Sequence, residues 1–157
     1  MSLEQDLGNI LLEKNLTIST AESCTGGLLS SRLTDISGSS AFIKLNVVTY
    51  ANEIKNTILN VSNKTLETHG AVSAQCAQEM VLGLKKLSNA DICIATTGIA
   101  GPTGGSVDKP VGLCYIGLLA KEKLTIKKIL MPQTADRKTL KDLFATSALE
   151  LVFKSLQ

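Results

Sequence analysis

Hydrophobic and polar positions follow two periodicities along this chain, one typical of helices and one typical of strands. Leucine and isoleucine recur at helical spacing over residues 3–14, which predicts an amphipathic first helix. Residues 16–22 alternate as a short strand does, and the Gly26-Gly27 pair after them opens a second helix that ends near residue 35. The apolar stretch over residues 42–51 predicts a buried strand.

The second half of the chain continues this alternation of helix and strand. Its expected elements are two short helices up to residue 66, a longer helix over 73–87 capped by Ser73, strands over 91–96, 111–120 and 123–131, and a terminal helix over 134–156. The apolar run within 91–96 is typical of the centre of a sheet. The pattern predicts an α/β fold, a three-layer α/β/α sandwich with a mixed, mostly parallel sheet. We expect the last two strands to be antiparallel, because only a few residues separate them.

Composition and charge narrow the classes of function. The 157 residues are 44% hydrophobic, which suits a single domain over residues 1–157 and argues against disorder. No apolar run is long enough to span a bilayer, and the first residues lack the basic start of a signal peptide, so we expect a cytoplasmic protein without membrane contact. A net charge of +2, with three Phe, two Tyr and no Trp, argues against nucleic-acid binding.

Cysteine and histidine usage limits the chemistry further. The four cysteines are scattered without a C-x-x-C pair, so we expect reduced thiols that serve mostly as small core residues. The chain contains one histidine, His69, which precludes a zinc site with two or more histidine ligands. Any Ser-His or Cys-His mechanism would have to use that residue, and its place before Gly70 favours a capping or packing role.

The candidate chemistry begins at the turn Thr20-Ala21-Glu22-Ser23-Cys24-Thr25-Gly26-Gly27, between an expected strand and an expected helix. The free N–H groups at such a helix start can bind an anion or stabilise an oxyanion beside a nucleophile. Ser23, Cys24 and Thr25 are the candidate nucleophiles. Ser23 and Cys24 should point in opposite directions, one to a cleft and one to the core, and the pattern does not indicate which.

A lysine is the base that remains when histidine triads are set aside. Lys55 follows the expected strand over 42–51 and stands at the start of a helix, so it is the best candidate. Burial would lower the pKa of its ammonium group and make it a base. The alternative, favoured by spacing alone, is an ordinary solvated lysine on a helix surface.

The glycine-rich segment 98–105 also allows two interpretations. It can be a tight connection after a central strand, or its backbone N–H groups can hold an anion such as a phosphate, with Lys109 nearby. It matches neither the phosphate loop of nucleotide hydrolases nor the dinucleotide fingerprint. Arg137 is a further candidate partner for phosphate or carboxylate, although its position also suits a surface charge at a helix end.

Several of these segments, in order and with the expected spacing, resemble the CinA C-terminal domain family. The matching blocks are TAESCTGG at 20–27, GSSAF at 38–42, VTYANEIK at 48–55, HGAVS at 69–73, TGIAGPTGG at 97–105 and KPVG at 109–112. Longer relatives carry an additional N-terminal module of molybdopterin-binding type, and this chain resembles the stand-alone form. The resemblance covers about residues 5–155.

The resemblance implies an activity and assigns residues to it. Members of the family include amidases that hydrolyse the carboxamide of nicotinamide mononucleotide to nicotinate mononucleotide and ammonia. It implies Ser23 as nucleophile, Lys55 as general base and Tyr50 as an assisting group. The residues expected to contact substrate are Thr25, Gly26 and Gly27 as oxyanion support, Thr97 and Gly98 beside the loop, and Lys109 and Arg137 as partners of the phosphate. It also implies a homodimer and an enzyme that needs no metal or cofactor.

Two rival hypotheses stand beside the serine amidase. A member of the family can be a catalytically silent nucleotide-binding or competence-associated module of the same fold. The enzyme can also be a thiol hydrolase that uses Cys24, because a thiol at a helix start ionises readily. The intact Ser23, Tyr50 and Lys55 favour the serine amidase.

Overall fold

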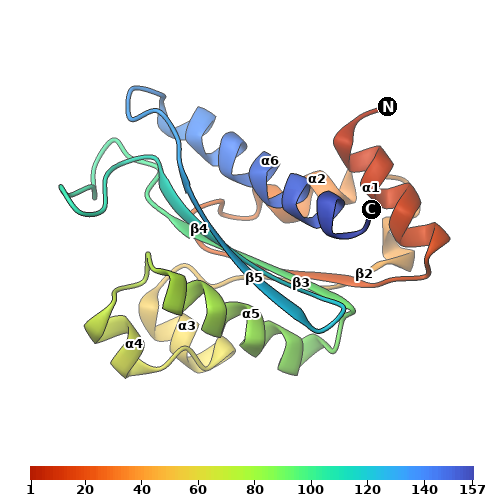
Figure 1. Ribbon diagram of the computed structural model, residues 1–157, viewed down its shortest axis with the longest axis horizontal. Helices are drawn as coiled ribbons and strands as arrows, with labels where there is room; N and C mark the ends of the chain where they lie inside the picture. The colour runs from red at the N-terminus through yellow and green to blue at the C-terminus, as the bar shows by residue number, and fades with distance from the viewer.

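The computed structural model describes residues 1–157, and its helices cover both faces of one five-stranded sheet (Figure 1). The elements are α1 (Leu3–Glu13), β1 (Ile18–Glu22), α2 (Leu28–Thr34), the 3-10 helix η1 (Ser39–Ala41), β2 (Ile43–Val48), α3 (Asn52–Leu59), α4 (Asn63–Thr68), α5 (Ala74–Ser88), β3 (Ile92–Gly98), β4 (Leu113–Ala120), β5 (Lys123–Leu130) and α6 (Arg137–Ser155). This order confirms the three-layer α/β/α sandwich that the hydrophobic pattern predicts.

Side-chain caps fix where several helices begin. The Ser73 hydroxyl accepts a hydrogen bond from the Cys76 N–H at the start of α5, as the sequence predicts. Ser2, Ser62 and Asp136 do the same for α1, α4 and α6. These caps satisfy N–H groups that the helix itself leaves without a partner, so they set the helix starts.

The strand order β2-β1-β3-β4-β5 creates a point at which the chain changes direction across the sheet. From β1 the chain moves outward to β2, and then it returns across β1 to β3; both neighbours are parallel to β1. The expected antiparallel pairing of β4 and β5 is confirmed. β4 is also antiparallel to β3, because the loop between them connects the two strands at the same end. Ligands of α/β sheets bind at the carboxyl ends of the strands on either side of such a switch point.

The position of β2 corrects one expectation from the sequence. Residues 42–51 predict a buried strand, but β2 forms the edge of the sheet and most of its side chains are half-exposed. Val48, at its end, is 46% exposed. The apolar composition that β2 shares with central strands does not reveal how many neighbours a strand has.

Two cores lie on opposite faces of the sheet. The larger one joins the sheet to α1, α2 and α6, and it includes Phe42, Leu140 and Phe144. The smaller one joins the sheet to α3 and α5, and it includes Leu59 and Met80. Figure 1 shows these two groups of helices above and below the strands. All four cysteines are buried and free, which confirms the prediction that they serve as core residues.

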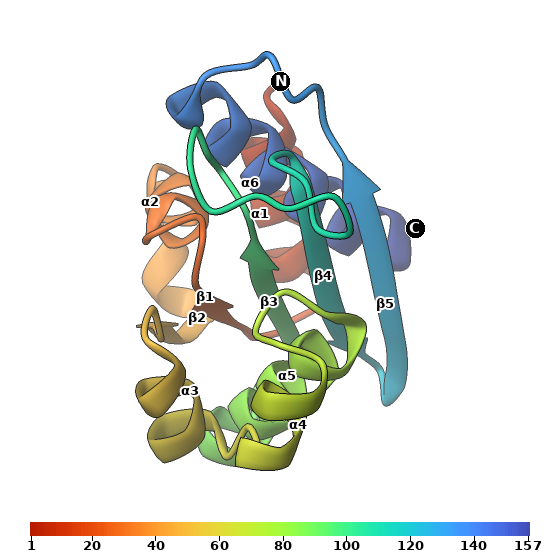
Figure 2. The same cartoon turned by 90° about the vertical axis from the view of Figure 1, so that its left-hand side faces the viewer.

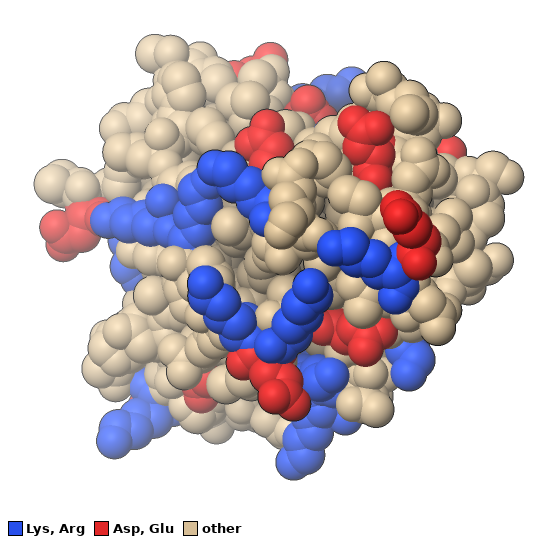
Figure 3. Space-filling view, turned by 45° about the vertical axis from the view of Figure 1, so that its right-hand side comes forward, with Lys and Arg blue, Asp and Glu red and all other residues tan.

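The outside of the molecule carries charges of both signs. On the face that Figure 3 shows, basic and acidic side chains are interspersed among uncharged surface. No helix in the structure combines the length and the apolar composition that crossing a bilayer would require.

Candidate active site

The candidate site lies at the switch point between β1 and β3. There the turn after β1, the start of α3 and the loop after β3 surround a pocket of about 230 Å³. Figure 2 shows this loop arching over the ends of the strands. Seven of the lining residues were named individually from the sequence: Ser23, Cys24, Tyr50, Lys55, Thr97, Gly98 and Arg137. Residues that lie 27 to 114 positions after Ser23 in the sequence thus come together with it at the carboxyl ends of β1 and β3.

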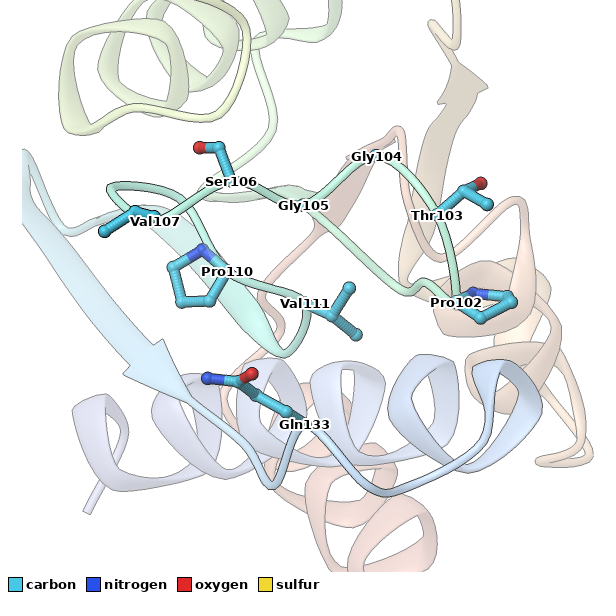
Figure 4. A pocket seen from close by; sticks show the side chains of 9 residues that line it. All are labelled: Pro102, Thr103, Gly104, Gly105, Ser106, Val107, Pro110, Val111 and Gln133. Carbon is cyan, nitrogen blue, oxygen red and sulfur yellow. The ribbon is translucent and has the colours of Figure 1, made fainter.

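A larger hollow of about 570 Å³ lies along the same loop, and Figure 4 shows it from close by. It is bordered by Pro102, Val107, Pro110, Val111 and Gln133 among others. None of its lining residues can ionise. The smaller pocket, in contrast, is lined by the ionisable side chains of Lys55 and Arg137.

The centre of the site is a direct hydrogen bond between Lys55 and Ser23. Lys55 Nζ lies 3.0 Å from Ser23 Oγ and 2.8 Å from the carbonyl oxygen of Tyr50. The Lys55 side chain is only 1% exposed although it stands on a helix at the surface. The sequence interpretation of Lys55 as a solvated helix lysine is therefore wrong for this structure.

The surroundings of Lys55 favour its neutral form. Burial lowers the pKa of its ammonium group below the ordinary range, against a smaller opposite effect of the Cys76 and Cys24 thiols. The only salt bridges in the molecule are those of Arg32, so no carboxylate is paired with Lys55. A neutral amine 3.0 Å from a hydroxyl has the geometry of a general base and its nucleophile.

The turn after β1 gives the neighbouring hydroxyl and thiol different partners. Ser23 faces α3 and the Lys55 amine, whereas Cys24 belongs to the core on the other face of the sheet. Cys24 Sγ lies 4.0 Å from Cys114 Sγ and is 6% exposed. Both residues line the pocket, but only the Ser23 hydroxyl lies within hydrogen-bond distance of the Lys55 amine, so the geometry favours Ser23 as the nucleophile.

The N–H groups of Gly26 and Gly27, which the sequence nominated as oxyanion donors, are not free in the structure. The Gly26 N–H donates to the Ser23 carbonyl at 3.1 Å, and the Gly27 N–H donates to a carboxylate oxygen of Glu22 at 3.2 Å. The side chain of Thr25 is buried and donates to Glu22 as well, at 2.6 Å. These groups are engaged inside the protein, whereas the N–H groups of Cys24 and Thr25 donate no hydrogen bond within the chain.

Glu22 is the residue that the sequence reasoning missed. Its carboxylate is fully buried at the start of α2, where it accepts hydrogen bonds from several groups of the turn and the helix. Glu22 is the last residue of β1 and lies five positions before the N-cap of α2, so no capping pattern in the sequence indicated that its carboxylate would reach the N–H groups of that helix.

Tyr50 and Arg137 form one wall of the pocket. Arg137, the first residue of α6, donates from Nη2 to Tyr50 Oη at 3.0 Å and from Nη1 to the Gly101 carbonyl at 2.6 Å. Opposite them, Thr97 Oγ1 donates to the Ala71 carbonyl at 2.8 Å and so ties β3 to the segment before α5. A side chain at Gly98 would meet the Leu113 carbonyl at 2.7 Å, so only glycine fits between β3 and β4 there.

Lys109 does not reach the pocket. Its ammonium group donates to the carbonyl of His69, the residue that ends α4, and thereby ties the loop after β3 to the opposite rim. His69 itself is exposed and does not line the pocket. No group of three or more His, Cys, Asp or Glu side chains lies close enough together to hold a metal ion.

Fold and site together define a three-layer α/β/α protein with a buried lysine on a serine hydroxyl at the switch point of its sheet. Comparison with protein families matches residues 1–156 to the CinA C-terminal domain. The chain belongs to this family.

Relatives and solved structures agree with this assignment. A CinA-like protein from Chloroherpeton thalassium is 47% identical over 154 residues, which are 97% of this chain and 37% of that protein. The chain spans about a third of the length of the curated relatives it matches. The crystal structure of competence/damage inducible protein CihA from Agrobacterium tumefaciens has a TM-score of 0.92 at 37% identity, covering 100% of this chain and 98% of that one. A CinA superfamily protein from Klebsiella pneumoniae has a TM-score of 0.93 at 32% identity, with 98% and 95% covered.

Proposed function

We propose that this protein is a serine amidase that hydrolyses the carboxamide of nicotinamide mononucleotide to nicotinate mononucleotide and ammonia. The observation that carries the proposal is the 3.0 Å contact between the buried Lys55 amine and Ser23 Oγ. Burial without a carboxylate partner lowers the pKa of the Lys55 ammonium group and favours the neutral amine that can act as a base, and Ser23 is the nucleophile within its reach. The substrate is the one that the family resemblance implies.

The first half of the reaction would form an acyl-enzyme. Neutral Lys55 accepts the proton of Ser23 Oγ while this oxygen bonds to the carboxamide carbon, and the carbonyl oxygen becomes an oxyanion. The intermediate collapses with cleavage of its C–N bond, and the Lys55 ammonium returns its proton to the departing nitrogen, which leaves as ammonia. The Tyr50 carbonyl, 2.8 Å from Nζ, holds the lysine in place through both proton transfers.

The second half would consume one water molecule. Lys55, neutral again, takes a proton from the water, whose oxygen attacks the acyl carbon. The bond to Ser23 Oγ then breaks, the lysine proton returns to this oxygen, and nicotinate mononucleotide is released. Proton transfer by a positioned base contributes about 10²- to 10⁴-fold to rates of this kind.

The phosphate of the substrate needs cations at the mouth of the pocket. Arg137 uses two of its N–H groups within the protein, and its remaining donors are available for a phosphate oxygen. Lys141, on the same end of α6, has its ammonium group 3.7 Å from where a side chain at Gly26 would begin. Both cations stand at the N-terminus of a long helix, whose dipole also favours an anion.

Ammonia release from nicotinamide mononucleotide tests the proposal. We expect turnover by the unchanged protein and losses of at least about a hundredfold for Ser23→Ala and Lys55→Ala. Cys24→Ala serves as the matched control, because it removes the neighbouring nucleophile without touching the Ser23–Lys55 pair. Absence of turnover in the unchanged protein would favour the silent nucleotide-binding module, and a selective loss in Cys24→Ala would favour the thiol hydrolase.

The homodimer is a separate part of the proposal. Family resemblance is its only support at this point, so it needs its own measurement. Sedimentation equilibrium is expected to give a mass of twice the 16.6 kDa chain. A mass of one chain at micromolar concentration would contradict it.

A further inference from the structure

Glu22 is a second buried ionisable side chain in the site, and the mechanism above does not use it. It is 0% exposed and directly precedes Ser23 in the chain. It accepts five hydrogen bonds, three from backbone N–H groups and two from hydroxyls. The donors are Gly27 N at 3.2 Å, Leu29 N at 2.9 Å, Ser30 N at 2.9 Å, Thr25 Oγ1 at 2.6 Å and Ser30 Oγ at 2.5 Å.

These bonds hold the reactive turn from both of its ends. On the helix side, Ser30 links Glu22 to α2 and to Thr20 Oγ1, which lies 2.7 Å away. On the turn side, Thr25 Oγ1 joins Glu22 and also contacts Thr96 Oγ1 at 2.8 Å. Glu22 therefore ties the turn to two strands and one helix, although no cation neutralises it.

The same bonds determine which backbone donors of the turn are free. Glu22 takes the N–H of Gly27, and the Ser23 carbonyl takes that of Gly26. The N–H groups of Cys24 and Thr25, directly after the nucleophile, have no acceptor in the chain. In α/β hydrolases the N–H after the nucleophilic serine is an oxyanion donor, and the same chemistry suits this turn.

We propose that Glu22 is the positioning residue of this site, which fixes the turn so that Ser23 faces Lys55 and the N–H groups of Cys24 and Thr25 receive the oxyanion. This inference rests on the proposed serine chemistry but not on the identity of the substrate. Glu22 acts through the turn and does not touch the reacting atoms. A carboxylate that only caps α2 would affect folding and leave the reactivity of the folded protein intact.

Glu22→Gln is the direct test, because it keeps the size of the side chain but turns an NH2 group toward hydrogen-bond donors. Removing one oxyanion donor commonly reduces kcat about 10²- to 10³-fold. We expect kcat for nicotinamide mononucleotide to fall about a hundredfold in the folded variant, with KM changed less than threefold. Circular dichroism and thermal unfolding define the folded fraction, to which the rates are normalised.

Two further variants separate the turn side of the cluster from its helix side. Thr25→Val removes the hydroxyl that joins Glu22 to the turn, and Ser30→Ala removes one that joins it to the helix. Positioning predicts that Thr25→Val lowers kcat at least tenfold, that Thr25→Ser recovers most of this loss, and that Ser30→Ala stays within threefold of the unchanged protein. Equal losses in Thr25→Val and Ser30→Ala, in proportion to their stability, would overturn the proposal.

A fluorophosphonate probe keeps the test independent of the substrate. Ser23 Oγ bonds to phosphorus, the P–F bond breaks with release of fluoride, and Lys55 takes the serine proton, while the phosphoryl oxygen occupies the oxyanion position. Mass spectrometry should show Ser23 labelled about a hundredfold more slowly in Glu22→Gln than in the unchanged protein. Labelling without amide turnover would contradict the proposed substrate alone. Equal labelling rates would overturn the role of Glu22, and no labelling of the unchanged protein would overturn both proposals.

Discussion

The site contains two buried ionisable side chains, Glu22 and Lys55, and their surroundings differ. Glu22 is fully buried and receives five hydrogen bonds. Lys55 is equally buried but contacts only Ser23 Oγ and the Tyr50 carbonyl. A charge inside a protein is stable when hydrogen bonds replace its water, and otherwise it tends toward its neutral form.

This difference separates a structural group from a reactive one. The five donors around Glu22 satisfy both of its carboxylate oxygens, and the carboxylate in turn holds the turn in place. The sparse surroundings of Lys55 lower the pKa of its ammonium group, because burial opposes the charge and no carboxylate supports it. Four predictions test this contrast, beginning with the largest effect.

Lys55→Met should remove activity while leaving the fold intact or more stable. Loss of the base is expected to lower kcat about 10³-fold. An apolar side chain of similar length in place of a poorly solvated amine should raise the free energy of unfolding by about 1 kcal/mol. Steady-state kinetics and urea unfolding measure the two quantities. A variant that unfolds more easily than the unchanged protein would show that Lys55 is a structural group after all.

Glu22→Ala should lower the free energy of unfolding, whereas Lys55→Met should raise it. Glu22→Ala leaves the N–H groups of Gly27, Leu29 and Ser30 without their acceptor, and each such group that stays out of water costs about 1–3 kcal/mol. With partial entry of water, we expect the free energy of unfolding to fall by about 3 kcal/mol in urea titrations. Glu150→Ala, at an exposed position of α6, is the same substitution without hydrogen-bond partners to lose and should change it little. A loss below about 1 kcal/mol would mean that the five hydrogen bonds do not hold the turn.

The sequence predicted the helices and strands around this site better than the burial and the hydrogen bonds within it. Hydrophobic periodicity and continuous apolar runs indicated the elements correctly, because the helices bury one face and the central strands β1 and β3 bury both. The motif blocks nominated Ser23 and Lys55. The edge position of β2 was not predictable, since an apolar strand carries no sign of its number of neighbours. The burial of Lys55 also escaped detection, because its exposed neighbours on α3 make the helix look solvated.

The inner hydrogen bonds of the turn were beyond the reach of spacing arguments. A glycine pair at a helix start suggests free N–H groups, and only the three-dimensional arrangement reveals that Glu22 and the Ser23 carbonyl occupy two of them. Likewise, Lys109 looked like a phosphate partner from its place beside the glycine loop, yet it binds the His69 carbonyl. Such contacts depend on which segments fold back on one another.

The pH dependence of activity should report the charge of Lys55. Because the neutral amine is the active form, kcat/KM should fall tenfold per pH unit on the acidic side of its pKa, which lies below the ordinary lysine value of about 10.4. The unfolded chain binds this proton more tightly, so the unchanged protein should gain stability relative to Lys55→Met as pH rises toward the ordinary value. Rate profiles and urea titrations in the same buffers measure both trends. A rate independent of pH would exclude a titrating base.

Tyr50→Phe should have the smallest effect, because the atom of Tyr50 that holds Lys55 is its backbone carbonyl. The substitution removes only the hydroxyl that accepts a hydrogen bond from Arg137 at the mouth of the pocket. A bond of this kind contributes about 0.5–1.5 kcal/mol, so we expect KM to rise up to about tenfold and kcat to change less. A hundredfold fall in kcat with unchanged KM would make the hydroxyl a proton donor in the reaction. The reactive half of the site would then include Tyr50 beside Lys55, and the contrast with Glu22 would involve a proton relay instead of a single amine.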